Sequence, residues 1–192
     1  MRLPVTLKVS DRARGSEVTA RIRRTIFPDI LQWRAWIYAS DAQDRDWEWL
    51  TIFAESIKYP RRFECYSLIV ESDLHCLMRL DLRGRRLHGV RWLIIEYLAT
   101  NPADRSDRAG IKYLGESMVA VATERSLEHN LQGRVWLESL PRAQKFYENL
   151  GFEQLKRRSK DGYKTYTLDP DTAVQLLTAI KKRRGWKDAE EV

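Results

Sequence analysis

Residues 146–152, FYENLGF, join the end of a short helix to the start of a strand. Ala143, Phe146 and Leu150 recur at helical spacing, so they form one apolar face. Tyr147 sits at the edge of that face, where its ring can pack while its hydroxyl points into a cleft. The stretch therefore predicts a helix–strand junction with an edge tyrosine, and the upstream sequence must decide whether that tyrosine has a function.

The flanking residues mark where this helix begins and ends. Pro141 favours the backbone of a first helical turn, and Gly151 supplies a left-handed residue that stops the helix. The same pattern also fits an ordinary helix–strand junction with a half-buried tyrosine.

The whole chain has the length and composition of one globular domain, spanning residues 1–192. No apolar run approaches the roughly 20 residues that cross a bilayer, and the first residues lack the apolar segment of a secretory signal. Cys65 and Cys76 fall in adjacent strand-like segments but not opposite each other, which favours buried free thiols. We expect a cytoplasmic protein without a membrane segment.

The net charge of +7 comes largely from local clusters of basic residues. They are RARG and RIRR near the start, RGRR at 83–86, KRRSK at 156–160 and KKRRGWK at 181–187. Such clusters favour polyanions, either nucleic acid or a phosphate-bearing cofactor. A solvated basic face with a frayed tail is the alternative interpretation.

The periodicity of apolar residues changes several times along the chain. Strand-like patterns cover 5–9, 64–71, 75–82, 91–100, 133–139, 152–158 and 163–168. Helix-like patterns cover 16–27, 28–40, 44–60, the segment after the loop 101–110, the segment before Gly151, and 170–180. This order predicts a mixed α/β (α+β) layer fold.

Two of the expected helices have a definite buried face. In 44–60, Asp44 caps the helix, Pro60 ends it, and the apolar face comprises Trp47, Leu50, Ala54 and Ile57 with Phe53 beside them. In the helix after the loop, the buried face comprises Ile111, Leu114, Met118, Val121 and Ala122.

The loop NPADRSDRAG, residues 101–110, lies between a predicted strand and that second helix. Unpaired N–H groups and the positive end of the helix dipole at such a junction favour a pyrophosphate. Arg105, Arg108 and Lys112 add positive charge. An ordinary loop with solvated charges is the alternative for the loop taken alone.

Together these segments resemble the GNAT-type N-acetyltransferase family. The likeness rests on YLATNPADRSDRAGIKYLGESMVAVATERS, residues 97–126, followed by GRVWLESLPRAQKFYENLGFE, residues 133–153. The family's Ala-x-x-x-Tyr-x-x-x-Gly-Phe pattern is met by Ala143, Tyr147, Gly151 and Phe152. The resemblance is strongest over residues 92–153.

The resemblance implies a central, mostly antiparallel mixed sheet that splays at its middle, with helices on both faces. The family core would cover about 62–168, and the N-terminal segment 16–58 would form the acceptor side. Residues 170–192 would add a C-terminal helix and a basic tail. It also implies acetyl-CoA as co-substrate, an amine as acceptor, no metal, and a homodimer formed through sheet edges as one option.

The family's Arg/Gln-x-x-Gly-x-Gly/Ala loop can be placed here in two registers. Counting from Pro102 puts Arg105 first and Gly110 last, with Arg108 at the middle glycine. Counting back from the helix puts Gly110 first, Tyr113 in the middle and Gly115 last, and this second register is preferred. Ser139 takes the place of the family's pantetheine-contacting Asn, whose position holds a leucine. The resemblance thus implies a cofactor site comprising Leu98, Ala99, Thr100, Arg105, Arg108, Gly110, Lys112, Tyr113, Leu114, Gly115 and Ser139.

The resemblance assigns Tyr147 as the acid that protonates the departing CoA thiolate. An alkylamine is mostly protonated at neutral pH, so a base must accept its proton. Glu96 is the first candidate because strand alternation puts it on one face with Leu98 and Thr100, and burial there would raise its pKa.

Several alternatives to this catalytic assignment stay open. Glu96 could instead form a structural ion pair with Arg79 or Arg91, in which case Glu138 or a bound water would be the base. His75, His88 and His129 are too scattered for a metal site.

The sequence therefore predicts an acetyl-CoA-dependent N-acetyltransferase acting by direct attack of an amine. The alternative is a GNAT-like protein without catalysis that binds nucleic acid through its basic clusters.

Overall fold

The computed structural model describes residues 1, 3–39, 42–105, 110–156 and 163–188. Within these residues the strands form one nine-stranded sheet in the order β6-β1-β2-β3-β4-β5-β7-β9-β8. The strands are β1 (Val5–Asp11), β2 (Ser16–Arg24), β3 (Phe63–Val70), β4 (Asp73–Leu87), β5 (Val90–Thr100), β6 (Ile111–Lys112), β7 (Val135–Ser139), β8 (Glu153–Gln154) and β9 (Lys164–Leu168). All neighbouring strands are antiparallel except β5 and β7, which run parallel.

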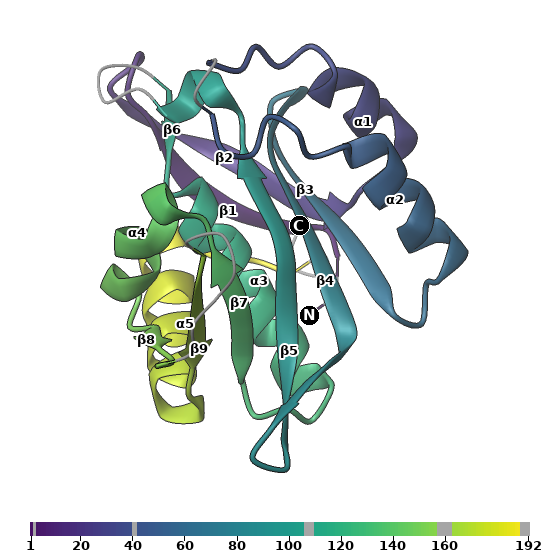
Figure 1. Ribbon diagram of the computed structural model, residues 1–192. Helices are drawn as coiled ribbons and strands as arrows, with labels where there is room; N and C mark the ends of the chain where they lie inside the picture. The colour runs from purple at the N-terminus through teal and green to yellow at the C-terminus, as the bar shows by residue number, and fades with distance from the viewer. Residues whose placement is uncertain (2, 40–41, 106–109, 157–162, 189–192) are drawn as a thin grey trace.

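Helices cover both faces of the sheet (Figure 1). The α-helices are α1 (Phe27–Trp33), α2 (Trp49–Lys58), α3 (Leu114–Glu128), α4 (Gln144–Asn149) and α5 (Pro170–Arg184), and 3₁₀ turns occupy Pro102–Arg105 and Pro141–Ala143. Helices α1 and α2 pack over β3 and β4 on one face, while α3 packs over β4, β5 and β7 on the other and holds α5 against itself. This arrangement confirms the expected mixed, mostly antiparallel fold with helices on both faces.

The two faces have separate apolar cores. The larger core lies under α3 and includes Leu93 and Ile95 of β5 with Met118 of α3. The smaller core lies under α1 and α2 and includes Trp49 and Ala99. Strand β5 therefore contributes side chains to both cores.

The N-terminal segment differs from its prediction, because residues 16–24 form strand β2 and not a helix. Ala20 and Ile22 are buried two residues apart, and the charged side chains between and beyond them face outward. That period of two is the period of a strand. The helix expected at 28–40 is likewise shorter, because α1 ends at Trp33.

The helix expected at 44–60 begins five residues later, at Trp49, and turns a different face to the sheet. Its buried residues are Trp49, Ile52, Phe53 and Ser56, whereas Leu50 and Ile57 are exposed. The expected apolar face was wrong, because Trp49, Ile52, Phe53 and Ser56 also recur at helical spacing and it is this face that packs on β3. Asp44 lies outside the helix and caps nothing there.

The remaining elements agree with expectation more closely. Strands β3 and β5 lie within one residue of their predicted bounds, whereas β4 runs from Asp73 to Leu87 and continues beyond the 75–82 that was predicted. The free thiols of Cys65 and Cys76 are buried without facing each other. Two further details differ: Ile111 belongs to β6, ahead of α3, and the strand expected at 152–158 is reduced to the two residues of β8. Among the described residues, no helix is long and apolar enough to cross a membrane.

Candidate functional site

Strands β5 and β7 separate in the middle of the sheet. They pair only from Leu93 opposite Val135 to Ile95 opposite Leu137, and both then continue without a mutual partner. Beyond Ile95, β5 is paired on its β4 side alone within the described residues. The backbone of Tyr97–Ala99 therefore has free hydrogen-bonding groups on the side that faces the gap.

A pocket of about 440 Å³ occupies this gap. It is lined by Ala42, Gln43, Asp44, Leu98, Thr100, Arg105, Gly115, Leu140, Arg142, Ala143, Phe146 and Tyr147. The size is that of a small-molecule site. Side chains from β5, the segment before α2, the start of α3 and the helix α4 thus converge where the sheet opens.

Tyr147 lines this pocket from α4. Its ring meets Phe146 and Phe152 edge to face, at centroid distances of 4.9 Å and 5.5 Å. Gly151, at φ +87°, ends the helix in the left-handed region that glycine favours. Burial raises the pKa of the Tyr147 phenol well above its ordinary value, with a further rise from the nearby thiol of Cys76. A phenol is protonated at neutral pH even at its ordinary pKa of about 10, so Tyr147 carries the proton that a donor needs, although the raised pKa makes it a weaker acid.

Glu96 lies at a β-bulge in β5, at the point where β5 and β7 part. Residues Arg79 and Leu80 of β4 pair with Tyr97 and Ile95, so Glu96 has no partner across the β4–β5 ladder. The extra residue changes the alternation of side chains. Glu96 consequently lies with Arg79 on the α2 face, and the expectation that it shares a face with Leu98 and Thr100 was wrong.

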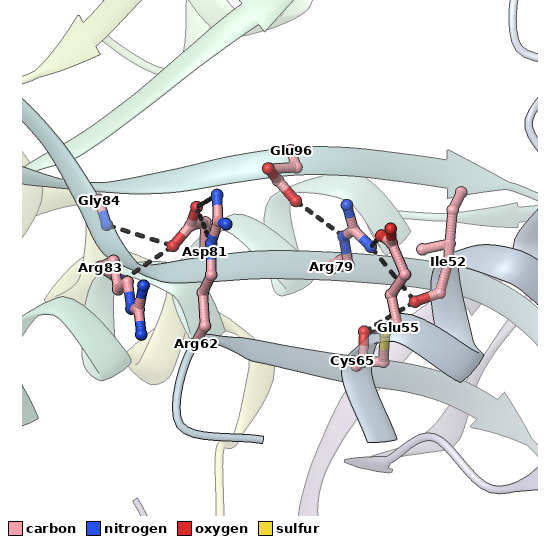
Figure 2. Close-up of polar contacts among 10 residues, drawn as sticks. Ile52, Glu55, Arg62, Cys65, Arg79, Asp81, Arg83, Gly84 and Glu96 are labelled. Carbon is pink, nitrogen blue, oxygen red and sulfur yellow. Dashed lines mark hydrogen bonds and ion pairs between the residues drawn. The ribbon is translucent and has the colours of Figure 1, made fainter. Parts of the chain in front are cut away.

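Arg79 holds the Glu96 carboxylate in place (Figure 2). The Arg79 guanidinium donates from Nε to Glu96 Oε2 at 2.7 Å and from Nη1 to Glu55 Oε2 at 2.7 Å. It also lies over the rings of Phe63 and Tyr97. Burial raises the pKa of the Glu96 carboxyl, although the charge and hydrogen bond of Arg79 oppose that rise. The Arg79–Glu96 ion pair, which was the alternative to a catalytic role for Glu96, is therefore present. The raised pKa of Glu96 is also compatible with a role as base.

Solved structures of similar shape reveal the family of folds to which this one belongs. No protein-family model and no curated protein matches the sequence. A structure of AtaTR bound with acetyl-CoA superposes with a TM-score of 0.58 at 15% identity, covering 81% of this chain and 97% of that one. The chain has the GNAT acetyltransferase fold.

Two further neighbours carry the same fold. A putative GNAT-family acetyltransferase from Desulfovibrio desulfuricans has a TM-score of 0.55 at 16% identity, covering 79% of this chain and 99% of its own. The Bacillus subtilis N-acetyltransferase YlbP, solved in complex with coenzyme A, has a TM-score of 0.53 at 12% identity, covering 79% and 97%.

The loop before α3 contains a non-glycine residue with a positive φ. Tyr113 caps α3 at φ +71°, in the left-handed region where glycine is preferred. Arg184 of α5 holds it there, with its guanidinium carbon 3.3 Å from the Tyr113 ring centroid and its Nε donating to Glu116. A positive φ is the conformation that glycine favours, but the register of this loop stays a prediction.

Gly115 explains why the last loop position needs a small residue. A Cβ built there would lie 2.8 Å from the ring of Phe146, so α3 and α4 approach closely only because the side chain is absent. The first N–H groups of α3, at Leu114 to Glu116, have no partner within the helix. They lie beside the pocket at the positive end of the helix dipole.

Other expected cofactor residues lie at the site with their side chains engaged elsewhere. Arg105 lines the pocket but donates to both carboxylate oxygens of Asp44 and to the carbonyl of Thr100. Ser139 is buried and donates to the carbonyl of Leu140, and Ala99 points into the smaller core. Lys112 belongs to β6, which pairs with β1, whereas Arg108 lies outside the described residues.

The contact between Asp44 and Arg105 forms part of the pocket wall. Asp44 is buried, and the two residues are 61 positions apart in the sequence. Gln43 adds a second contact by accepting from the backbone N–H of Arg142. The sequence carried no local signal for this role, because Asp44 resembles a helix cap.

The structure also shows where Glu138, the alternative base, and the basic clusters lie. Glu138 of β7 is half exposed and lies 3.9 Å from Arg85. Several clustered cations are neutralised by carboxylates, as in the pairs Arg23–Asp29, Arg24–Glu64, Lys181–Glu124 and Arg184–Glu116. Among the described residues, no group of three His, Cys, Asp or Glu side chains could hold a metal ion. Nucleic-acid binding and dimerisation stay predictions.

Proposed function

We propose that this protein transfers the acetyl group of acetyl-CoA to an amine acceptor by direct attack. The observation that carries the proposal is the pocket at the parting of β5 and β7, lined by the protonated Tyr147, in a fold whose solved relatives hold acetyl-CoA or coenzyme A. The free backbone groups of β5 would bind the pantetheine arm. The N–H groups at the start of α3 would bind the pyrophosphate.

In this scheme the acceptor nitrogen attacks the thioester carbonyl carbon, a C–N bond forms and the C–S bond breaks. Tyr147 gives its proton to the departing thiolate and is reprotonated, through water, by the second proton that the nitrogen loses as it becomes an amide. Glu96 does not line the pocket itself, but it lies at the same parting of the strands on the α2 face and has a raised pKa, so it takes the proton lost by the ammonium group through a water. Glu138 is the alternative base, on the neighbouring strand.

Calorimetric titration with acetyl-CoA tests the proposal most directly. We expect one-to-one binding with a dissociation constant in the micromolar range, and weaker binding of 3′-dephospho-CoA. A panel of amines with detection of released CoA thiol then tests transfer. The absence of acetyl-CoA binding to the folded protein would contradict the proposal.

A further inference from the structure

A second pocket, of about 540 Å³, lies where α2 ends and β3 begins. It is lined by Glu55, Lys58, Tyr59, Pro60, Arg61, Arg62, Phe63 and Arg83. Four of these side chains are cationic and one is a carboxylate. The volume is that of a small-molecule site, and the aromatic rings of Tyr59 and Phe63 offer apolar contact beside the charges.

Two of the cations are available to a ligand. Arg61 and Arg83 are exposed, and neither side chain forms a hydrogen bond or ion pair within the described part of the chain. The backbone N–H of Arg83 donates to Asp81 Oδ1 at 2.9 Å, which holds the irregular stretch of β4 between Asp81 and Arg85 (Figure 2). Arg61 and Arg83 therefore add positive charge that no neighbouring carboxylate neutralises.

Two of the remaining charges, Arg62 and Glu55, are held by neighbouring charges, whereas the exposed Lys58 lies over the ring of Tyr59. Arg62 donates from Nε and Nη2 to Asp81 Oδ2, at 3.0 Å and 2.9 Å, and lies over the ring of Phe63. The carboxylate of Glu55 accepts from Arg79. The carboxylate that lines the pocket is thus already compensated, so the free charge there is positive.

This pocket is connected to the proposed base. Glu55 on its wall is joined to Glu96 through Arg79 by two hydrogen bonds of 2.7 Å each (Figure 2). Both Glu96 and the pocket lie on the face of the sheet that α2 covers. An acceptor anchored in the pocket could therefore extend its amine along this face toward Glu96.

From this arrangement we infer that the pocket at Arg61 and Arg83 binds an anionic group, a carboxylate or a phosphate, carried by the amine acceptor. The inference rests on the proposed acetyl transfer and adds the class of its acceptor. Guanidinium groups bind both kinds of oxyanion through paired N–H donors. The concave shape suits a compact anion better than a long polyanion, and its positive charge disfavours polyamines.

The first test compares matched acceptors in two variants. The double variant R61Q/R83Q removes the guanidinium groups of the two unpaired arginines. The control R86Q removes an exposed charge from the β4–β5 hairpin outside the pocket. Acceptors are 3-aminopropyl phosphate and 5-aminopentanoate against propylamine and pentylamine. Each lost guanidinium contact is worth roughly tenfold in affinity. We expect kcat/KM for the acceptors that carry an anionic group to fall about 100-fold in R61Q/R83Q, with little change for propylamine and pentylamine or in R86Q.

A second test measures anion binding in the pocket without catalysis. Inorganic phosphate is titrated into the protein while the Nε–Hε signals of arginine are followed by NMR. The signals of Arg61 and Arg83 should shift with saturation, and R61Q/R83Q should abolish that saturable component. Acetyl-CoA affinity, measured by calorimetry, should be the same in the variant, so failure of acetyl transfer and failure of the anion pocket are separated.

Two results would overturn the inference. One is an equal loss of kcat/KM for the acceptors with and without an anionic group, together with no phosphate-induced shift at Arg61 or Arg83. The other is a short single-stranded RNA that binds through these two arginines while small anions do not, because the pocket would then serve a polyanion.

Discussion

Replacing Arg79 with methionine tests both the stability and the chemistry of the site. Arg79 is 5% exposed and donates to Glu96, to Glu55 and to the carbonyl of Ile52. Methionine keeps much of the aliphatic volume beside Phe63 but removes every one of these donors. The Glu96 carboxylate then stays partly buried without a partner.

The loss of stability in R79M depends on how deeply the two carboxylate partners of Arg79 are buried. Leaving a buried charge unpaired typically costs about 3–5 kcal/mol. Glu96 keeps 23% side-chain exposure and Glu55 is 49% exposed, so solvent screening lowers the cost. We therefore expect a loss of about 2–3 kcal/mol in the free energy of unfolding. At about 2–4 °C per kcal/mol for a chain of this size, Tm should fall by roughly 4–12 °C.

The same change should move the pH dependence of catalysis. Arg79 lowers the pKa of Glu96 through its charge and its hydrogen bond, so R79M leaves only the smaller effect of Arg62 to oppose burial and raises that pKa. As pH falls, the Glu96 carboxylate is then protonated at a higher pH than in the wild-type protein. The acid limb of the kcat/KM profile therefore moves to higher pH. Unfolding followed by circular dichroism and pH–rate profiles of CoA release measure the two effects.

The variant E55Q is the matched control. It removes the other carboxylate that Arg79 contacts, but Glu55 is half exposed, so stability and the acid limb should change little. If R79M is folded and active at 25 °C with the acid limb of wild-type protein, Glu96 is not the base. If R79M loses no stability, the ion pair does not compensate a buried charge.

Three further predictions concern other parts of the molecule. Y147F should lower kcat at least tenfold with unchanged acetyl-CoA affinity by calorimetry, and wild-type turnover would remove Tyr147 from the mechanism. At Glu64, burial raises the pKa, but hydrogen bonds from Arg125 and other donors outweigh it and leave the pKa lowered. Its stabilisation is therefore present above the ordinary value of 4.5 and is lost as pH falls through the lowered pKa. E64Q should then cost about 1.5–3 kcal/mol at pH 7 in urea unfolding and less at acidic pH; an equal cost at both would refute this. D44N should weaken the contact with Arg105 and raise KM for acetyl-CoA several-fold with kcat preserved, and an unchanged KM would show that this contact does not shape the pocket.

The parts of the fold that depend on neighbouring residues could be predicted from the sequence. The helix at Tyr147 was predicted together with its stop at Gly151, because a helix face and a left-handed stop are local properties of the chain. The three strands from Phe63 to Thr100 followed from runs of apolar residues. Ser16–Arg24 was mistaken for a helix because two buried positions are a weak signal of period two among many charged residues.

The candidate site needed contacts between distant residues. Strand alternation alone put Glu96 on the wrong face, because the bulge exists only where β5 is paired with β4. Asp44 and Arg105 meet across 61 residues, and nothing local distinguishes this aspartate from a helix cap.

The second pocket shows most clearly which features depend on tertiary contacts and not on local sequence. Its cations come from the end of α2, the start of β3 and the β4–β5 hairpin, which are brought together only by the packing of α2 on the sheet. The sequence by itself determined the local elements and the identity of the chemical groups. The tertiary structure decided which groups share a face or a cavity, since electrostatic and packing energies depend on distances in space and not along the chain.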